Sequence, residues 1–437
     1  LLANPAQDKN YIITRTYKQA TTTSIDSPTP TQAKVGITYY DGLGRPIQQI
    51  ANQQSDTGKD IVTHIEYDVF GRQTREYLPF VGSNKNMAFD SSAQNNTLSF
   101  YNISKYENTA NPFSEKVLEA SPLNRVLKQA APGADWAMGQ GHEVKLDYQT
   151  NTASEVKLFT ATATWNSTTG VYDTALNNTA GTTFYDANQL YKNVTFDENT
   201  SATPTETAGS TVEFKNKTGQ VVLKRTYATT GSVGSSLEQH DTYYVYDVYG
   251  NLTYVIPPKA DMALTQAILD ELCYQYQYDA RNRLVAKKLP GKQWEFMVYD
   301  KLDRVVATAP AFSPFSDSTD SGWLITKYDA FNRAVYTGWL NSPATSSTRS
   351  TMQQAQNTAT TINESKQTSG TIDGISAYYS NVVVPTGLKL LTVNYYDDYV
   401  MPNVSTQTSV EGQTVATAVK GLATGSWTRV ATTTTEA

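Results

Sequence analysis

The chain has 437 residues, more than one hydrophobic core usually serves, so several domains or one repetitive structure are expected. Its 29 tyrosines and a charged fraction of only 17% favour pleated, half-buried strands. The formal net charge of −6 gives no basic field for phosphate groups, which argues against nucleic acid and anionic lipid as partners. The sequence contains no apolar run of roughly 18 residues, so no transmembrane segment is expected.

A short motif, Tyr-Asp-x-x-[Gly/Asn/Asp]-[Arg/Asn], occurs six times along the chain. Only Gly, Asn and Asp readily adopt the left-handed conformation, so the fifth motif residue is predicted to have a positive φ. The aspartate can accept hydrogen bonds from N–H groups just after it, which closes a type I turn with a G1 bulge. Each motif is therefore predicted to form a β-hairpin tip. The motif residues are Tyr40, Asp41, Gly44 and Arg45; Tyr67, Asp68, Gly71 and Arg72; Tyr246, Asp247, Gly250 and Asn251; Tyr278, Asp279, Asn282 and Arg283; Tyr299, Asp300, Asp303 and Arg304; and Tyr328, Asp329, Asn332 and Arg333.

The sequence around the motifs predicts strands. Residues 61–67 alternate or are β-branched, as a strand with one covered face should be. Prolines follow several exit strands and are predicted to end them, because proline has no N–H for the ladder. These are Pro79, Pro257, Pro290 and Pro310. The predicted fold is all-β, with tandem hairpins that wind into a curved sheet or shell.

The remaining segments are degenerate copies, loops and one helix. Copies of the motif are expected at residues 121–125, 185–189 and 217–221, and inserted polar loops at residues 82–111, 200–210 and 342–370. One short helix is expected from Met262, Leu264, Ile268, Leu269 and Leu272, with Asp261 as a candidate N-cap.

The six motifs resemble the YD repeats of the Rhs family, whose members wind such hairpins into a hollow β-shell. Residues 8–12, 37–46 and 114–126 are similar to the N-terminal domain of Bacteroidota Rhs-like proteins. The resemblance covers most of residues 8–340. It implies a protein exported through a signal peptide and secreted or held at the cell surface. The opening Leu1–Ala6 segment is either the remnant of that signal peptide or simply the start of the given sequence.

In many relatives the shell encloses a toxic C-terminal domain. An Rhs-associated core, a self-cleaving aspartate motif and a toxin domain after Trp427 are not recognised in this sequence. Four regions are predicted: 1–80, an N-terminal Rhs-like domain with the first hairpins; 81–210, degenerate repeats and insertions; 211–340, a YD-repeat β-shell segment; and 341–437, a Thr/Ser-rich C-terminal β region.

Catalytic, cofactor and metal sites were sought and none is predicted. His64, His142 and His240 lack the spacing of a zinc site, and Cys273 has no partner for a disulfide or a metal knuckle. Gly42-Leu43-Gly44 lacks the third glycine and the helix of a dinucleotide loop. Asp397-Asp398 offers too few oxygens for Ca²⁺, so a degenerate hairpin tip is favoured.

Aromatic side chains could serve either the core or a glycan. The tryptophans are Trp136, Trp165, Trp294, Trp323, Trp339 and Trp427. Cross-strand aromatic pairs stabilise sheets, so packing is favoured over glycan contact. Glycans nevertheless remain candidate partners.

The leading functional hypothesis is a non-enzymatic structural shell or scaffold segment that encloses or presents a cargo or binding surface. The alternative is a cell-surface adhesin, or an accessory subunit docked on an outer-membrane export complex of the type 9 secretion kind or on a gliding-motility complex. A carbohydrate-active enzyme has little support, because the tip carboxylates already have a structural role. Sheet edges are adhesive, so the C-terminal rim is predicted to be covered by further chain or by another protein.

The turn chemistry generates the first testable prediction. Gly71→Val is expected to destabilise the protein by at least about 1–2 kcal/mol, because a β-branched residue is forced into a left-handed conformation. Asn332→Gly is expected to be nearly neutral. Thermal melts of both variants test this, and equal tolerance of the two changes would contradict the hairpin-tip assignment.

Overall fold

The computed structural model describes residues 8–18, 20–230, 236–260, 264–405, 407–430 and 433–434. Contacts between residues divide the chain into two compact units. The first unit contains Leu1–Thr152 and Ala187–His240, and the second contains Ala153–Asp186 and Asp241–Ala437. The four regions expected from the sequence stay a prediction of domain organisation.

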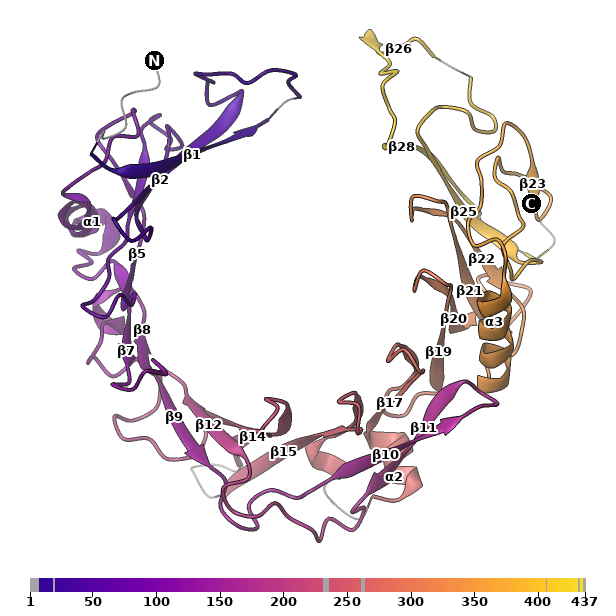
Figure 1. Cartoon of the computed structure of the whole chain (residues 1–437), viewed down its shortest axis with the longest axis horizontal. Helices are drawn as coiled ribbons and strands as arrows, with labels where there is room; N and C mark the ends of the chain where they lie inside the picture. Colours follow the sequence, from indigo (N-terminus) through magenta and orange to yellow (C-terminus); the bar gives the residue numbers. More distant parts are fainter. Residues whose placement is uncertain are drawn as a thin grey trace. The chain divides into compact units, whose positions relative to one another are not determined.

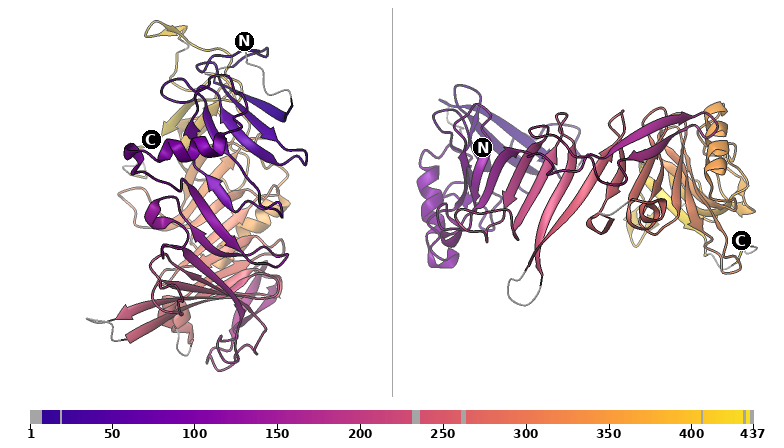
Figure 2. Two further views of the ribbon diagram at one scale, coloured as in Figure 1. Left: turned by 90° about the vertical axis from the view of Figure 1, so that its left-hand side faces the viewer. Right: turned by 90° about the horizontal axis from the view of Figure 1, so that it is seen from below.

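The first unit begins with a five-stranded antiparallel sheet of order β1-β2-β3-β4-β6 (Figure 1). Its strands are β1 (Asn10–Tyr17), β2 (Ala33–Tyr40), β3 (Pro46–Ala51), β4 (Ile61–His64) and β6 (Phe80–Val81). Alternate residues of β2 are buried, as a strand with one covered face requires. They pack with Met87 and with Ala93 at the start of helix α1 (Ala93–Tyr101). This is the core of the sheet, and α1 lies beside it (Figure 2).

A second run of antiparallel strands completes the first unit. Its pairing order is β5-β7-β8-β9-β12-β13-β14. The strands are β5 (Arg75–Tyr77), β7 (Phe113–Leu118), β8 (Val126–Ala130), β9 (Val144–Thr150), β12 (Tyr191–Phe196), β13 (Ser210–Lys215) and β14 (Val221–Thr230). The 3₁₀ helices η1 (Ser104–Tyr106) and η2 (Ala134–Trp136) lie in the connections. The loop expected at residues 200–210 lies between β12 and β13 and ends where β13 begins.

The second unit is built mainly from consecutive hairpins whose strands pair in chain order. They are β15 (Ser236–Tyr246, of which Asp241 onward belongs here), β16 (Leu252–Ile256), β17 (Tyr274–Tyr278), β18 (Leu284–Lys288), β19 (Trp294–Tyr299), β20 (Val305–Phe312), β21 (Ser321–Tyr328) and β22 (Ala334–Leu340). Buried Phe296, Trp323, Ile325 and Tyr336 lie at the centre of its core. Because successive hairpins are side by side, their tips follow one edge of the sheet (Figure 1).

The hairpin sheet continues past residue 340, where the repeats were expected to stop. Strand β22 pairs with β25 (Lys389–Tyr396), and β25 pairs with β28 (Ala423–Thr428). The pairs β23 (Thr371–Ile372) with β24 (Ile375–Ser376) and β26 (Ser409–Val410) with β27 (Gln413–Thr414) are short additions. These strands lie in the predicted C-terminal β region, but their pairing with the repeat strands was not predicted, because long insertions separate them in sequence.

An inserted hairpin, β10 (Thr160–Asn166) with β11 (Val171–Asn177), also belongs to the second unit. It contacts β17, and the Tyr254 hydroxyl of β16 donates a hydrogen bond of 3.1 Å to the Thr174 carbonyl in β11. No sequence motif marked this hairpin.

Three α-helices are present in the described residues, where the sequence predicted one. Helix α2 (Gln266–Leu272) is the expected one, preceded by the 3₁₀ helix η3 (Pro258–Ala260). Its N-cap is Thr265, whose side chain accepts from the Ile268 N–H, whereas Asp261 lies outside the described residues. None of the described helices is long and apolar enough to cross a membrane.

Helices α1 and α3 (Ser346–Thr358) occupy two segments that were predicted to be loops. The helical pattern of α3 was hidden because its buried side chains are polar, namely Arg349, Gln353 and Gln356. Helix α3 packs against β19, and Figure 2 shows it in orange along the strands of the second unit. The prediction of a β-rich structure of antiparallel hairpins is confirmed, and the number of helices was wrong.

The predicted strand ends hold at three prolines and fail at the fourth. Strand β5 ends two residues before Pro79. Strand β16 ends just before Pro257, and β18 ends two residues before Pro290. Strand β20 instead continues through Pro310. Its register with β21 shifts between Thr308 and Ala311, so the residue without an N–H falls in an irregular part of the ladder.

Candidate functional site

The aspartate of each tip binds its own turn. At Asp300, one carboxylate oxygen accepts from the N–H groups of Leu302 at 2.9 Å and Arg304 at 3.0 Å. The other accepts from Arg304 Nε at 2.6 Å. The same pattern occurs at Asp41, Asp68, Asp279 and Asp329, and at Asp247 with the amide of Asn251 in place of the guanidinium.

The fifth motif residue is left-handed at all six tips. The φ angles are 76° at Gly44, 77° at Gly71, 84° at Gly250, 57° at Asn282, 62° at Asp303 and 63° at Asn332. In the five tips that join paired strands, the register shifts at the motif tyrosine, as a bulge requires. The turn after Tyr67 differs from the predicted hairpin. It connects β4 in the five-stranded sheet to β5 in the next run of strands.

Neighbouring tips are joined through the motif tyrosines. The hydroxyl of Tyr299 donates a hydrogen bond of 2.7 Å to the carbonyl of Leu284, the residue after Arg283 of the preceding tip. The Arg283 guanidinium lies over the Tyr299 ring, 4.7 Å from its centre. The same pair of contacts joins Arg45 to Tyr67, Arg304 to Tyr328 and Arg333 to Tyr396. The tyrosine and arginine therefore act between repeats, which the sequence pattern did not reveal.

The fifth residue has a second role where it carries a side chain. Arg283 Nη1 donates to Asp303 Oδ1 of the next tip at 2.7 Å, and Arg304 Nη1 donates to Asn332 Oδ1 at 3.1 Å. Asn332→Gly would therefore remove a hydrogen bond, and the expectation that it is nearly neutral needs correction. A small loss is now expected, because Asn332 lies at an exposed tip.

The degenerate copies divide into true tips and one other turn. At residues 121–125 the carboxylate belongs to Glu119, which binds Arg125 Nε at 3.0 Å, and Asn124 has a φ of 52°. At residues 217–221 Asn216 takes the aspartate's place. Residues 185–189 do not form a hairpin tip, because they precede β12 and β12 pairs with β9 and β13.

Asp397 follows the last tyrosine of β25, as a tip aspartate does, but residues 397–422 replace the tight turn between β25 and its partner β28. The φ of Asp397 is 75°, and both carboxylate oxygens accept from Arg333, at 2.9 and 2.7 Å. Asp398 pairs with Lys366 at 2.6 Å. The hydrogen bonds from Arg333 and from the Gly421 N–H hold the pKa of the Asp397 carboxyl well below its usual range. In the part of the chain that the structure describes, no three His, Cys, Asp or Glu side chains gather as metal ligands would.

The other residues singled out in the sequence lie apart. His64 is in β4 beside Tyr77, His142 packs against the Trp136 ring before β9, and His240 is in β15. Cys273 is buried, and burial raises the pKa of its thiol to about 11. Trp323 and Trp339 are buried in the core, whereas Trp136 and Trp165 are exposed.

The fourth motif residue of most tips is a large apolar side chain that faces solvent. Leu43, Phe70, Tyr249, Leu302 and Phe331 are between 51% and 79% exposed. Leu43 and Phe70 lie in the first unit, and Tyr249, Leu302 and Phe331 lie in the second. We call the three residues of the second unit the apolar tip row. The row is the main candidate site, because the turn beneath each of its residues is fixed by the aspartate and its bonded partner. Its members stand along one edge of the sheet.

Residues 13–150 match a family model described as a domain of unknown function, DUF6443. No curated protein sequence matches the chain. Among solved structures, the chain is similar to the crystal structure of TcdB2-TccC3-Cdc42, with 14% identity and a TM-score of 0.44 over 87% of this chain and 16% of that one. It is also similar to the Photorhabdus luminescens Tc holotoxin pore, with 14% identity and a TM-score of 0.42 over 87% and 16%. The chain thus corresponds to a small part of those longer chains.

The contacts between tips predict that arginine cannot be replaced by lysine at Arg304. Its guanidinium binds Asp300, the Asp329 carbonyl and the Ile362 carbonyl at once, which an ammonium group cannot reproduce. Arg304→Lys should lower the free energy of unfolding by about 1.5–3 kcal/mol, measured by denaturant titration. Arg281→Lys is the matched control. Arg281 and Asp303 form an exposed ion pair, which should contribute under about 1 kcal/mol to the free energy of unfolding. Similar losses in both variants would contradict the proposed contacts.

The acid sensitivity of the protein should depend on Glu119. Hydrogen bonds from Arg125 and Ser121 lower the pKa of Glu119 from 4.5 to about 2. The folded-state pKa lies below the unfolded value, so the stabilisation is present above pH 4.5 and is lost as the pH falls toward 2. Glu119→Gln should therefore be less stable at pH 7 and should lose less stability over that window. Denaturant midpoints measured across the window, with the exposed Glu271→Gln as control, test the difference.

Proposed function

We propose that this chain is a non-enzymatic scaffold segment of an exported protein of the Rhs/YD-repeat kind, and that its hairpin tips hold or present another polypeptide. The apolar tip row is the observation that carries the proposal. Exposed apolar groups with polar surroundings are typical of protein interaction sites. Here each apolar side chain stands on a turn fixed by an aspartate and, at all but one tip, a bonded arginine, so little conformational freedom is lost on binding.

The proposal that the chain is not an enzyme follows from the same turns. The tip carboxylates accept hydrogen bonds from their own backbone and, at most tips, are paired with arginine, so they are poor general acids or bases. In this proposal the hairpins wind into a curved sheet or shell around a cargo. The protein is secreted or held at the cell surface, and further chain or a protein partner covers the rim at β28.

A docked surface protein is the second candidate. One observation favours it: the β10–β11 turn, α3 and two hairpin tips enclose a cavity lined mainly by polar side chains. Such a protein would be an adhesin or an accessory subunit of an outer-membrane export or gliding-motility complex.

Photo-crosslinking in the native host, from the full reading frame, distinguishes these functions. A photo-reactive phenylalanine at Phe331 should capture peptides of the same polypeptide from beyond these 437 residues, or of one co-secreted polypeptide. The control places the same group at Phe312, which is 79% exposed in β20 and is not a tip residue.

Each outcome at Phe331 has a separate meaning. Capture of outer-membrane proteins would replace the scaffold proposal with the docked one. Capture at Phe331 no greater than at Phe312 would show that the tip row does not hold a polypeptide.

A further inference from the structure

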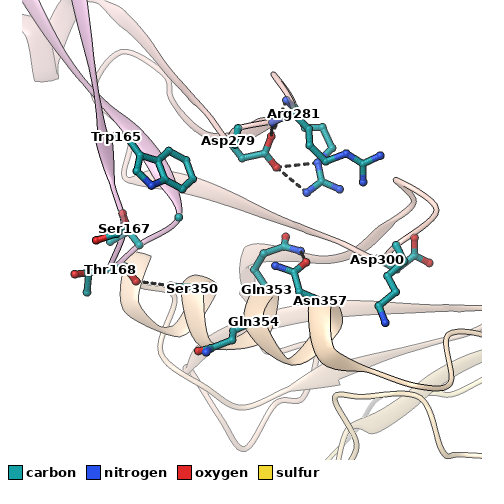
Figure 3. A pocket seen from close by; sticks show the side chains of 15 residues that line it. Trp165, Ser167, Thr168, Asp279, Arg281, Asp300, Ser350, Gln353, Gln354 and Asn357 are labelled. Carbon is teal, nitrogen blue, oxygen red and sulfur yellow. Dashed lines mark hydrogen bonds and ion pairs between the residues drawn. The ribbon is translucent and has the colours of Figure 1, made fainter.

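A cavity of about 560 Å³ opens in the second unit (Figure 3). The turn between β10 and β11 forms one wall, with Trp165 and Ser167. The tips that begin at Asp279 and Asp300 form a second wall, and α3 provides Gln354 and Asn357. Its volume is within the range of small-molecule sites.

The cavity walls are held in place by buried contacts from α3. Arg349, only 2% exposed, donates to the Thr169 carbonyl at 3.0 Å and to the Met297 carbonyl at 3.2 Å. Ser350 Oγ donates to the Thr168 carbonyl at 2.9 Å. Helix α3 therefore fixes the inserted hairpin to the sheet, and the cavity is formed before any ligand arrives.

Gln353 joins α3 to the neighbouring tip. Its side chain accepts from the Tyr299 N–H at 3.0 Å and donates to the Tyr299 carbonyl at 2.7 Å. This amide thus completes the hydrogen bonding of one backbone residue. Gln353 therefore holds α3 against the neighbouring tip, and its amide is already hydrogen-bonded and is not available to a ligand.

The charged side chains around the cavity already have partners. Arg281 and Arg283 both bind Asp303 at 2.7 Å, and Arg283 also binds Asp279. Asp300 is paired with Arg304, and Lys301 Nζ donates to the Ala359 carbonyl at 2.6 Å. The guanidinium and carboxylate groups lining the cavity are paired with opposite charges, and Lys301 is bound to a carbonyl, so a charged ligand would have to displace an existing contact. A neutral ligand is favoured.

The groups left for a ligand are an aromatic ring, amides and a hydroxyl. Trp165 is 45% exposed, and its indole rests edge-on against Tyr172 at 5.1 Å. In Figure 3 it extends toward the loop of Asp279 and Arg281. The side chains of Ser167 and Gln354 make no hydrogen bond with another described residue, and Asn357 uses only its Oδ1. Donors, acceptors and one flat apolar surface thus meet in one place.

We propose that this cavity binds a neutral pyranose residue of a glycan. A pyranose has an apolar C–H face, which matches the Trp165 ring, and a rim of hydroxyl groups that both donate and accept, which matches Gln354, Asn357 and Ser167. The site goes beyond the scaffold function and does not depend on it, because no residue of the apolar tip row lines the cavity.

The test is calorimetric titration of the purified chain with soluble oligosaccharides. The probes are neutral glucose, galactose, mannose and N-acetylglucosamine oligomers, together with sulfated and sialylated forms. At least one neutral oligomer should bind. Trp165→Ala should weaken that binding by about tenfold, and Gln354→Ala should weaken it severalfold.

Trp136→Ala is the matched control, because Trp136 is 42% exposed and packs against His142 in the first unit. It should bind the oligomer as the unchanged protein does. Thermal melts confirm that each variant is folded. The inference is overturned if no neutral oligomer binds, if only the charged forms bind, or if folded Trp165→Ala retains full affinity. The crosslinking result at Phe331 is independent of all three outcomes.

Discussion

The hydrogen bonds between each tip aspartate and its own turn are the interaction on which the rest of the structure depends. One carboxylate accepts two backbone N–H groups and, at five of the six motif tips, an arginine, so the turn and the start of the exit strand are fixed by a single side chain. A left-handed residue must follow within the same turn, which restricts it to Gly, Asn or Asp. The hairpin register is set by this turn, because the bulge lies at the tyrosine beside it.

Because each turn is fixed, its side chains can form the same contacts with the next repeat. The arginine that neutralises its own aspartate also covers the tyrosine ring of the following tip, and that tyrosine binds the backbone just after the arginine. Both residues thus serve two hairpins. The charged and polar side chains of the motif find their hydrogen-bond partners along the sheet edge. The apolar fourth residue is left to face solvent. The apolar tip row is therefore a direct consequence of how the repeats are joined.

The inserted hairpin β10–β11 and helix α3 give the second unit a cavity in addition to the apolar tip row. Helix α3 carries Arg349 and Gln353 on its buried face, and these side chains satisfy backbone groups of the inserted hairpin and of Tyr299. Polar residues can stabilise such packing because every buried backbone group needs a partner. The result is a cavity on the hairpin sheet in which the charged side chains of the tips are already bound to other groups.

The sequence alone determined the hairpin tips, the left-handed fifth residues and the β-rich class, because these depend on interactions within about six neighbouring residues. Tertiary structure decided the rest. The role of Glu119 was missed because its partner Arg125 lies six residues away, outside the four-residue spacing of the motif. The pairing of Asp397 with Arg333 rests on a partner far along the chain, and the helix at Arg349 rests on polar burial. Apolar periodicity cannot reveal a helix whose buried face is polar, and a motif cannot reveal which distant tip its arginine will contact.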